Sequence, residues 1–166
     1  PVATFTHTAG NVTLGKAYAL TAIGTYTLTA GTLNLGGYNL TTGIFSSTTA
    51  NTRSIAFGTG NIVLAHTTIS QTVLAMAIVT GFTWTGTGGF TADASVTRTF
   101  TFGTTGGTSA SVPNLTLTGS GTAILTFTLG SWFNKLDFGT TAFVIATTTL
   151  NVNSITLSTG GTFTAL

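Results

Sequence analysis

The stretch Thr32–Gly43, TLNLGGYNLTTG, decides the fold class of this chain. Polar and apolar residues alternate in TLNL and again after the glycine pair, which is the period-two pattern of strands that bury one face. The glycine pair itself is typical of a tight turn. The stretch aligns without gaps on Thr149–Gly160, TLNVNSITLSTG, so the sequence predicts the same unit of strand, two-residue turn and strand at two distant places.

A second motif, apolar-x-Phe-Gly-Thr, occurs at Ile55–Thr59, Phe100–Thr104 and Leu136–Thr140. The apolar residues that lead the strongest strand patterns follow one another at steps of 22, 27, 18, 15, 21 and 14 residues, with a mean of 19.5; they are Leu33, Ile55, Phe82, Phe100, Leu115, Leu136 and Leu150. Such a step is about one coil of a solenoid. We therefore predict an all-β, irregular parallel β-solenoid (β-helix) of about eight coils.

The competing architecture is an antiparallel β-sandwich or jelly roll, which also contains many short strands joined by regularly spaced turns. The near-identical units at distant positions favour the solenoid, because sandwich strands lie in unlike environments. In either case residues 1–166 form a single repeat-built β domain. The chain begins with Pro1, so we expect it to be a fragment or module of a longer fibrous protein.

Threonine dominates the polar positions of this sequence. There are 43 Thr residues, whereas charged residues make up 4% of the chain and Glu is absent. The branched side chain of Thr suits a pleated strand and disfavours a helix. The alternation in Thr25–Thr29 and Thr99–Phe102 then places aromatic and aliphatic residues inside and hydroxyl groups outside. We expect the outer surface to be a nearly uncharged hydroxyl surface.

Several classes of site and partner are excluded by composition. The absence of Cys excludes disulfides and thiolate metal sites. Four scattered basic residues form no stripe that could follow a phosphate backbone, so we expect no nucleic-acid partner. The longest apolar stretch, Val73–Val79, is far shorter than the roughly 20 residues of a membrane-spanning helix, so we expect no membrane insertion. His7 and His66 have no acidic neighbours, and we expect neither a metal nor a cofactor.

No catalytic residue is predicted. Cleavage of a glycosidic bond usually takes two carboxyl groups, and Asp93 and Asp137 are the whole acidic set. Asp93 lies in TADAS, where an Asp commonly makes a local turn bond, and Asp137 should point outward beside Lys135. Neither histidine belongs to a recognisable nucleophile signature. The sequence therefore indicates a protein that is not an enzyme.

Four residues are candidates for contact with a surface partner or ligand. Arg53 and Arg98 each precede an apolar-x-Phe-Gly-Thr motif by two residues, and we interpret both as donors to backbone carbonyl groups where the chain enters a strand. The alternative is a small guanidinium array that binds an anionic sugar or phosphate. Trp132 and Phe133 are adjacent and cannot both face inward on one strand, so one of them is predicted to be exposed and to contact sugar or a partner chain.

The stretches Gly31–Ser47 and Arg53–Asn61 resemble the Thr/Gly-rich repeat regions of bacteriophage tail-fibre and other virion surface proteins, and bacterial fibrous adhesins look similar. The resemblance implies a shaft, decoration or receptor-contact module at the virion surface or outside a cell. It also implies partners: copies of the same chain, and cell-surface carbohydrate. It transfers no catalytic residues.

Three functions remain open from sequence. The first is a non-enzymatic structural or adhesive module of a surface fibre that associates with itself. The second is an ice-binding solenoid that uses outward Thr-x-Thr arrays. The third is a glycan-cleaving tailspike, which the shortage of acidic residues disfavours. Uncapped solenoid ends expose unpaired strand edges, which favours the self-associating module.

Overall fold

The structure is a computed structural model that describes residues 3–93, 96–105, 113–119, 122–127, 131–138, 142–145, 150–157 and 162–165. Within these residues the chain forms strands and no helix. The strands are β1 (Thr4–His7), β2 (Asn11–Thr13), β3 (Tyr18–Ala19), β4 (Thr25–Leu28), β5 (Gly31–Asn34), β6 (Leu40–Thr42), β7 (Ile44–Ser46), β8 (Arg53–Gly58), β9 (Ile62–Leu64), β10 (Gln71–Ile78), β11 (Phe82–Gly86), β12 (Gly89–Asp93), β13 (Arg98–Thr105), β14 (Asn114–Thr118), β15 (Thr122–Phe127), β16 (Ser131–Phe138), β17 (Ala142–Ile145), β18 (Leu150–Leu157) and β19 (Thr162–Ala165).

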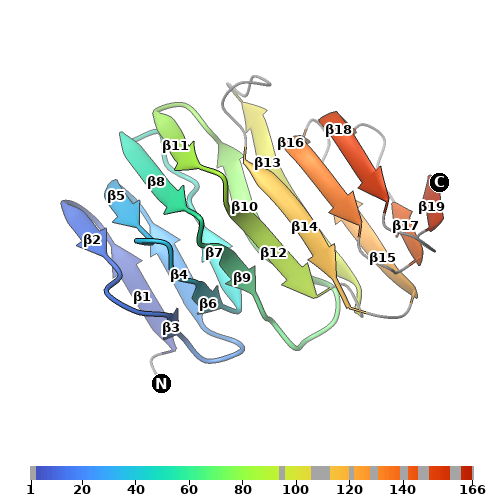
Figure 1. Cartoon of the computed structure of the whole chain (residues 1–166), viewed down its shortest axis with the longest axis horizontal. Coiled ribbons are helices and arrows are strands. Elements are labelled where there is room, and N and C mark those ends of the chain that lie inside the picture. Colours follow the sequence, from blue (N-terminus) through green and yellow to red (C-terminus); the bar gives the residue numbers. More distant parts are fainter. Residues whose placement is uncertain are drawn as a thin grey trace.

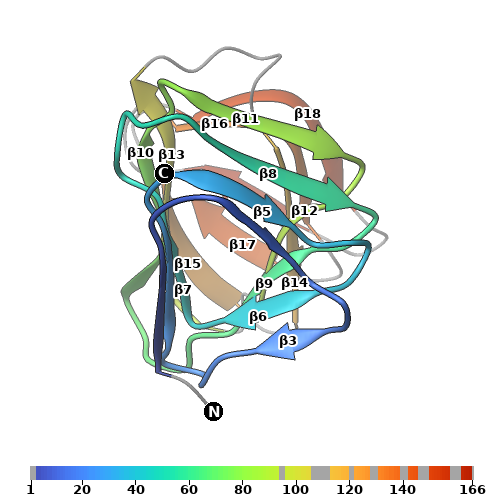
Figure 2. The same ribbon diagram turned by 90° about the vertical axis from the view of Figure 1, so that its left-hand side faces the viewer.

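Three parallel sheets form the sides of a solenoid. Sheet A has the order β1-β4-β7-β10-β13-β15-β17-β19, sheet B the order β11-β8-β5-β2, and sheet C the order β18-β16-β14-β12-β9-β6-β3. Figure 1 shows the strands stacked from the N-terminal end to the C-terminal end, and Figure 2 looks onto the N-terminal end, where the chain winds around a common interior. The predicted parallel β-solenoid is confirmed. The antiparallel alternative is wrong, because the described pairings are parallel.

The coils are longer than the sequence spacing indicated. Along sheet C, successive inward residues in register are Tyr18, Leu40, Ile62, Phe90, Leu115, Leu136 and Ile155, at steps of 19 to 28 residues. In the described residues the first four coils contribute a strand to each sheet, and the next three contribute strands to sheets A and C only. The predicted count of about eight is therefore slightly too high for complete turns.

The repeat motifs do not occupy equivalent places in the coils. The three copies of apolar-x-Phe-Gly-Thr begin in β8 of sheet B, in β13 of sheet A and in β16 of sheet C. The turn predicted at Asn153 and Ser154 is wrong as well, since β18 continues through both residues. Such a motif marks an inward-facing strand that ends at a corner. It carries no information about which of the three sheets receives the strand.

The interior consists of columns of apolar side chains that run along the solenoid. In β4 the exposure alternates as predicted, with Thr25 and Thr27 on the outside and Tyr26 and Leu28 buried. The ring of Tyr26 stacks on Phe5 of the preceding coil, with centroids 5.0 Å apart, and on Phe45 of the following coil, 5.7 Å away. Offset ring stacking of this kind adds about 0.5–1.5 kcal/mol per pair beyond area burial.

Glycine allows the coils to approach at the corner between sheets B and C. A Cβ atom placed on Gly88 would lie 1.8 Å from the carbonyl oxygen of Gly60 in the preceding coil. A Cβ on Gly60 would in turn lie 2.1 Å from the carbonyl oxygen of Tyr38. The obstructing atoms belong to the backbone and cannot rotate away. Any side chain at these positions must therefore separate two coils.

The first two coils also share a buried polar pair. The Nε2 atom of His7 lies 3.2 Å from the carbonyl oxygen of Gly10, and a carbonyl accepts, so the ring proton is on Nε2. The Nδ1 atom is then free to accept a hydrogen bond from the hydroxyl of Tyr26 at 3.3 Å. Burial disfavours the phenolate and raises the pKa of Tyr26 above its usual value.

We expect Gly88→Ala to lower the free energy of unfolding by about 1–3 kcal/mol, because the new methyl group pushes against the Gly60 carbonyl. Gly15→Ala is the matched control. A Cβ on Gly15 has no atom within 4 Å, so this variant should stay within about 0.5 kcal/mol of the original chain. Urea unfolding followed by Trp84 fluorescence measures both. Equal stability of the two variants would contradict the close approach of the coils.

Tyr26 should make the protein less stable in alkali. The phenol of an unfolded chain ionises near pH 10, whereas the folded phenol stays protonated, so stability falls above about pH 10 by up to about 1.4 kcal/mol per pH unit. Tyr26→Phe removes this dependence and loses one hydrogen bond worth about 1 kcal/mol at neutral pH. Unfolding free energies measured from about pH 8 to about pH 11 should show the gap between the two proteins closing. A constant gap would disprove the assignment.

Candidate functional site

Arg53 lies inside the solenoid, where sheet A meets sheet B. It is 1% exposed. Its Nε donates to the Ser47 hydroxyl, and its two terminal nitrogens donate to the carbonyl oxygens of Asn51 (3.1 Å), Thr80 (2.9 Å), Ser47 (3.3 Å) and Ile78. The guanidinium also lies 5.6 Å from the centre of the Phe82 ring. All five N–H groups are used, so the predicted donor role of Arg53 towards carbonyl groups is confirmed.

Arg98 lies in a different place, at the corner between sheets C and A, and donates two hydrogen bonds to described residues. It is 3% exposed. Its Nε donates to the carbonyl oxygen of Asp93 at 3.1 Å, and its Nη1 donates to that of Thr68 at 3.4 Å. Burial lowers the pKa of Arg98, and the nearby charge of Asp93 partly opposes that change. The prediction that both arginines occupy the same place in two repeats is wrong, because β8 and β13 belong to different sheets.

Phe133 is not a surface residue. It is fully buried and packs on Phe102, with ring centroids 5.8 Å apart. The side chain of Trp132 lies outside the part that the structure describes, so its predicted contact with sugar or a partner chain stays a prediction. Arg53 and Phe133 are thus corrected from surface candidates to core residues. The local sequence could not show which of Trp132 and Phe133 faces inward, because the two residues are adjacent on one strand.

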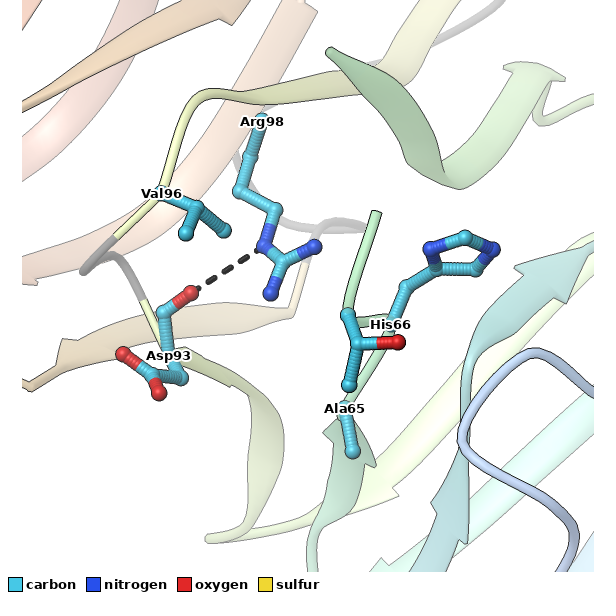
Figure 3. Close-up of a pocket in the computed structure, with 6 residues that line it drawn as sticks. Ala65, His66, Asp93, Val96 and Arg98 are labelled. Carbon is cyan, nitrogen blue, oxygen red and sulfur yellow. Dashed lines mark hydrogen bonds between the residues drawn. The ribbon is translucent and has the colours of Figure 1, made fainter. Parts of the chain in front are cut away.

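A pocket of about 240 Å³ opens beside Arg98. Its lining comes from the loop that joins β9 to β10 and from described residues at the end of β12 and around the start of β13. Figure 3 shows Arg98 and Asp93 on one side of the pocket and Ala65 on the other, with the hydrogen bond from Arg98 to Asp93 dashed. The lining residues are Ala65, His66, Thr67, Asp93, Val96 and Arg98. Sequence reasoning did not group these residues, because they come together only when the two loops stack.

His66 and Asp93 both line the pocket, and the ring of His66 is bonded within its own loop. The Nδ1 atom of His66 accepts a hydrogen bond from the backbone N–H of Thr68 at 3.1 Å. In Figure 3 the imidazole points away from Asp93 and Arg98. Asp137, the other acidic residue, lies on β16 and pairs with Lys135 at 2.9 Å, as predicted. The pocket therefore has one arginine and one aspartate among its lining residues.

The outer face of sheet A carries an interrupted row of hydroxyl groups. Along one register the outward residues are Thr6, Thr27, Ser46, Ala75 and Thr101. A second row of outward residues, two positions earlier on each of these strands, begins with Thr4 and Thr25 and continues with Ile44. A regular Thr-x-Thr array is therefore present on β1 and β4 and is lost on β7 and β10.

The N-terminal end of the solenoid exposes part of its core. A second pocket of about 240 Å³ is lined by Phe5, Val12, Leu14, Tyr18 and Tyr26. Strands β1, β2 and β3 each lie at the edge of a sheet, and none contains a charged residue. Unprotected edges of this kind can pair with another strand. Tyr18 is 36% exposed here, and Ile155, which ends the same inward column on β18, is 45% exposed.

The comparisons give no family to which the chain can be assigned. No protein-family model, no curated protein and no solved structure matches it. Within the described residues, no helix has the length and hydrophobicity required to cross a bilayer. Functional inference therefore depends on the geometry of this chain.

We expect Arg53→Met to lower the free energy of unfolding by about 3 kcal/mol or more, since it leaves several carbonyl groups without a donor, at about 1–3 kcal/mol for each that stays buried. Arg98→Met loses two hydrogen bonds to carbonyl groups of described residues, and we expect it to cost less. Urea unfolding of both variants checks the order. A larger loss for Arg98→Met would show that the roles of the two arginines are reversed.

Proposed function

We propose that this chain is a non-enzymatic structural and adhesive module of an extracellular or virion surface fibre, in which solenoids associate end to end with copies of themselves. The observation that carries the proposal is the inward column of sheet C. Leu40, Ile62 and Phe90 in its middle are buried, whereas Tyr18 and Ile155, its first and last members among the described residues, are exposed. A further coil placed on either end would continue the column.

Backbone geometry supports the same association. Parallel strands pair only through the N–H and C=O groups on their edges, and the three N-terminal strands leave one edge each without a described partner. Each coil of the chain already pairs with the next in register. A second copy offers the same sheets at the same spacing, so it suits the exposed edges better than an unrelated surface does.

The outer surface supports a passive role. Arg53 and Arg98 are buried, which leaves Lys16 and Lys135 as the basic residues of the surface. This distribution supports the expectation that nucleic acid is not a partner. The interruption of the hydroxyl row at Ile44 and Ala75 gives the ice-binding alternative little support. The tailspike alternative has little support either, because Asp137 does not line the pocket that contains Asp93.

The proposal is tested by the association state of two variants that differ by one position. Tyr18 and Ala19 are neighbours on β3 and both are exposed, but Tyr18 ends the inward column and Ala19 faces outward. We expect the original chain to form concentration-dependent assemblies in sedimentation velocity. Tyr18→Lys should abolish them because it places a charge in the joint, whereas Ala19→Lys should leave them intact. A monomer at millimolar concentration, or equal loss in both variants, would overturn end-to-end association.

A further inference from the structure

The pocket at the N-terminal end of the solenoid has the size of one aromatic ring. Its described lining comes from every strand of the first coil and from the second coil beneath: Phe5, Val12, Leu14, Tyr18 and Tyr26. Figure 2 faces this end of the molecule. The volume is about 240 Å³, and an enclosed apolar cavity of about 150 Å³ is already enough to hold benzene. One ring therefore fits here.

The side chains beneath the pocket show which group would fill it. The ring of Phe45 is stacked under that of Tyr26, with centroids 5.7 Å apart and an interplanar angle of 6°. The ring of Tyr26 is in turn stacked under that of Phe5, at 5.0 Å and 20°. Each of these rings is thus covered by the ring of the coil before it. Phe5 borders the pocket, so a ring placed there would extend the same column.

The backbone of β1 can hold a further strand beside this pocket. The carbonyl oxygens of Ala3 and His7 accept hydrogen bonds from amide groups at the two ends of β4, at 2.9 and 2.8 Å. Alternate residues of a strand direct their backbone groups to opposite edges, so Thr4 and Thr6 direct theirs away from β4. β1 is the first strand of sheet A, and none of the described strands pairs with that edge.

The pairing of β4 with β7 shows what kind of segment suits this edge. β4 lies on the N-terminal side of β7, which is the side that is open in β1, and the two strands are parallel with Tyr26 opposite Phe45. In β4 the ring residue stands between two threonines that face outward. A segment with the same alternation would place its ring on Phe5 while its backbone pairs with the open edge of β1.

Charge restricts the incoming segment further. Lys16, in the exposed loop between β2 and β3, is the one charged residue among positions 3–20. The described lining of the pocket contains no charged side chain. A charged group that entered the pocket would lose its water without gaining an opposite charge, which is costly. An uncharged segment with one aromatic residue and outward hydroxyl groups therefore suits this end.

We propose that the N-terminal end of this solenoid binds an extended segment by β-strand addition to β1, with an aromatic side chain of that segment stacked on Phe5 in the pocket. The segment has Thr on either side of its aromatic residue and belongs to an adjoining module of the fibre. The inference deepens the proposed function, on which it rests for the source of the segment, by naming the chemistry of the joint. The new contact continues the interface that already joins β1, β4 and β7.

A peptide with the sequence of residues 24–30, GTYTLTA, tests the site on the original chain. We expect saturable binding, seen by NMR as shifts of the Val12 and Tyr18 amide signals and as slower hydrogen exchange at Thr4 and Thr6. The matched control peptide, GTATLTA, lacks the ring and should bind at least about tenfold more weakly, because burial of the ring provides much of the affinity. Equal binding of the two peptides would overturn the role of the ring, and no binding of either would overturn the site.

The small molecule p-cresol separates strand addition from simple occupation of the pocket, because it carries the ring of tyrosine without a backbone. It should bind more weakly than the GTYTLTA peptide and leave hydrogen exchange at Thr4 and Thr6 unchanged. Binding as tight as that of the peptide would overturn strand addition. So would peptide binding that does not slow exchange at these two residues.

Two neighbouring positions of β2 localise the binding. Val12 lines the pocket, whereas Thr13 is exposed and faces outward. Val12→Asp places a carboxylate among the apolar walls and should abolish peptide binding, whereas Thr13→Asp should leave it unchanged. Unchanged binding in Val12→Asp would overturn the assignment to this pocket. If Val12→Asp does not fold, the two peptides decide the question, since they leave the chain unaltered.

The measurements are made at a dilution at which sedimentation velocity shows the chain to be monomeric. Peptide binding is then independent of self-association. A chain that binds the peptide without forming assemblies would contradict the proposed function alone, and a chain that forms assemblies without binding the peptide would overturn this inference alone.

Discussion

The structure depends on backbone hydrogen bonds between successive coils. A strand of sheet A, B or C has no partner within its own coil, so its N–H and C=O groups must pair with the coils before and after it. This requirement forces every coil to follow nearly the same outline. It explains why inward residues of similar size recur in register, as Leu40, Ile62 and Phe90 do. It also explains why backbone approaches backbone at Gly60 and Gly88, where a side chain would separate the coils.

The two buried arginines are found where that pairing is interrupted. In sheet C the steps from Ile62 to Phe90 and from Phe90 to Leu115 are the longest, at 28 and 25 residues. Described corner residues such as Asn51, Thr68 and Thr80 have carbonyl groups that accept from arginine side chains. At one corner Arg53 gathers the carbonyl groups of Ser47, Asn51 and Thr80. At the other corner Arg98 satisfies two carbonyl groups and borders an open pocket. The same residue type thus donates to corner carbonyl groups at both places.

The sequence allowed the class of fold and the inward face of strands such as β4 to be predicted, because both depend on the local alternation of Thr with apolar residues. The assignment of strands to sheets could not be predicted. Ile55, Phe100 and Leu136 begin the same motif yet lie on three different sheets. The sheet that a strand joins depends on the number of residues in the corner before it. The candidate site escaped prediction for a related reason: Thr67 and Arg98 are 31 positions apart and meet only through stacking. The burial of Arg53 depends on carbonyl groups from two loops, which no sequence motif marks.

Burial of the two arginines also limits the cleavage of the folded chain by proteases that cut after basic residues. All four basic residues lie in the described part of the chain, and two of them are enclosed. A trypsin-like enzyme must draw the basic side chain into its own specificity pocket, so cleavage at Arg53 or Arg98 requires a coil to open first. Lys16 and Lys135 are the remaining points of attack, and Lys135 is already engaged by Asp137. While the chain stays folded, a protease of this specificity therefore finds its accessible basic side chains at Lys16 and Lys135 alone, both of which lie in the described residues.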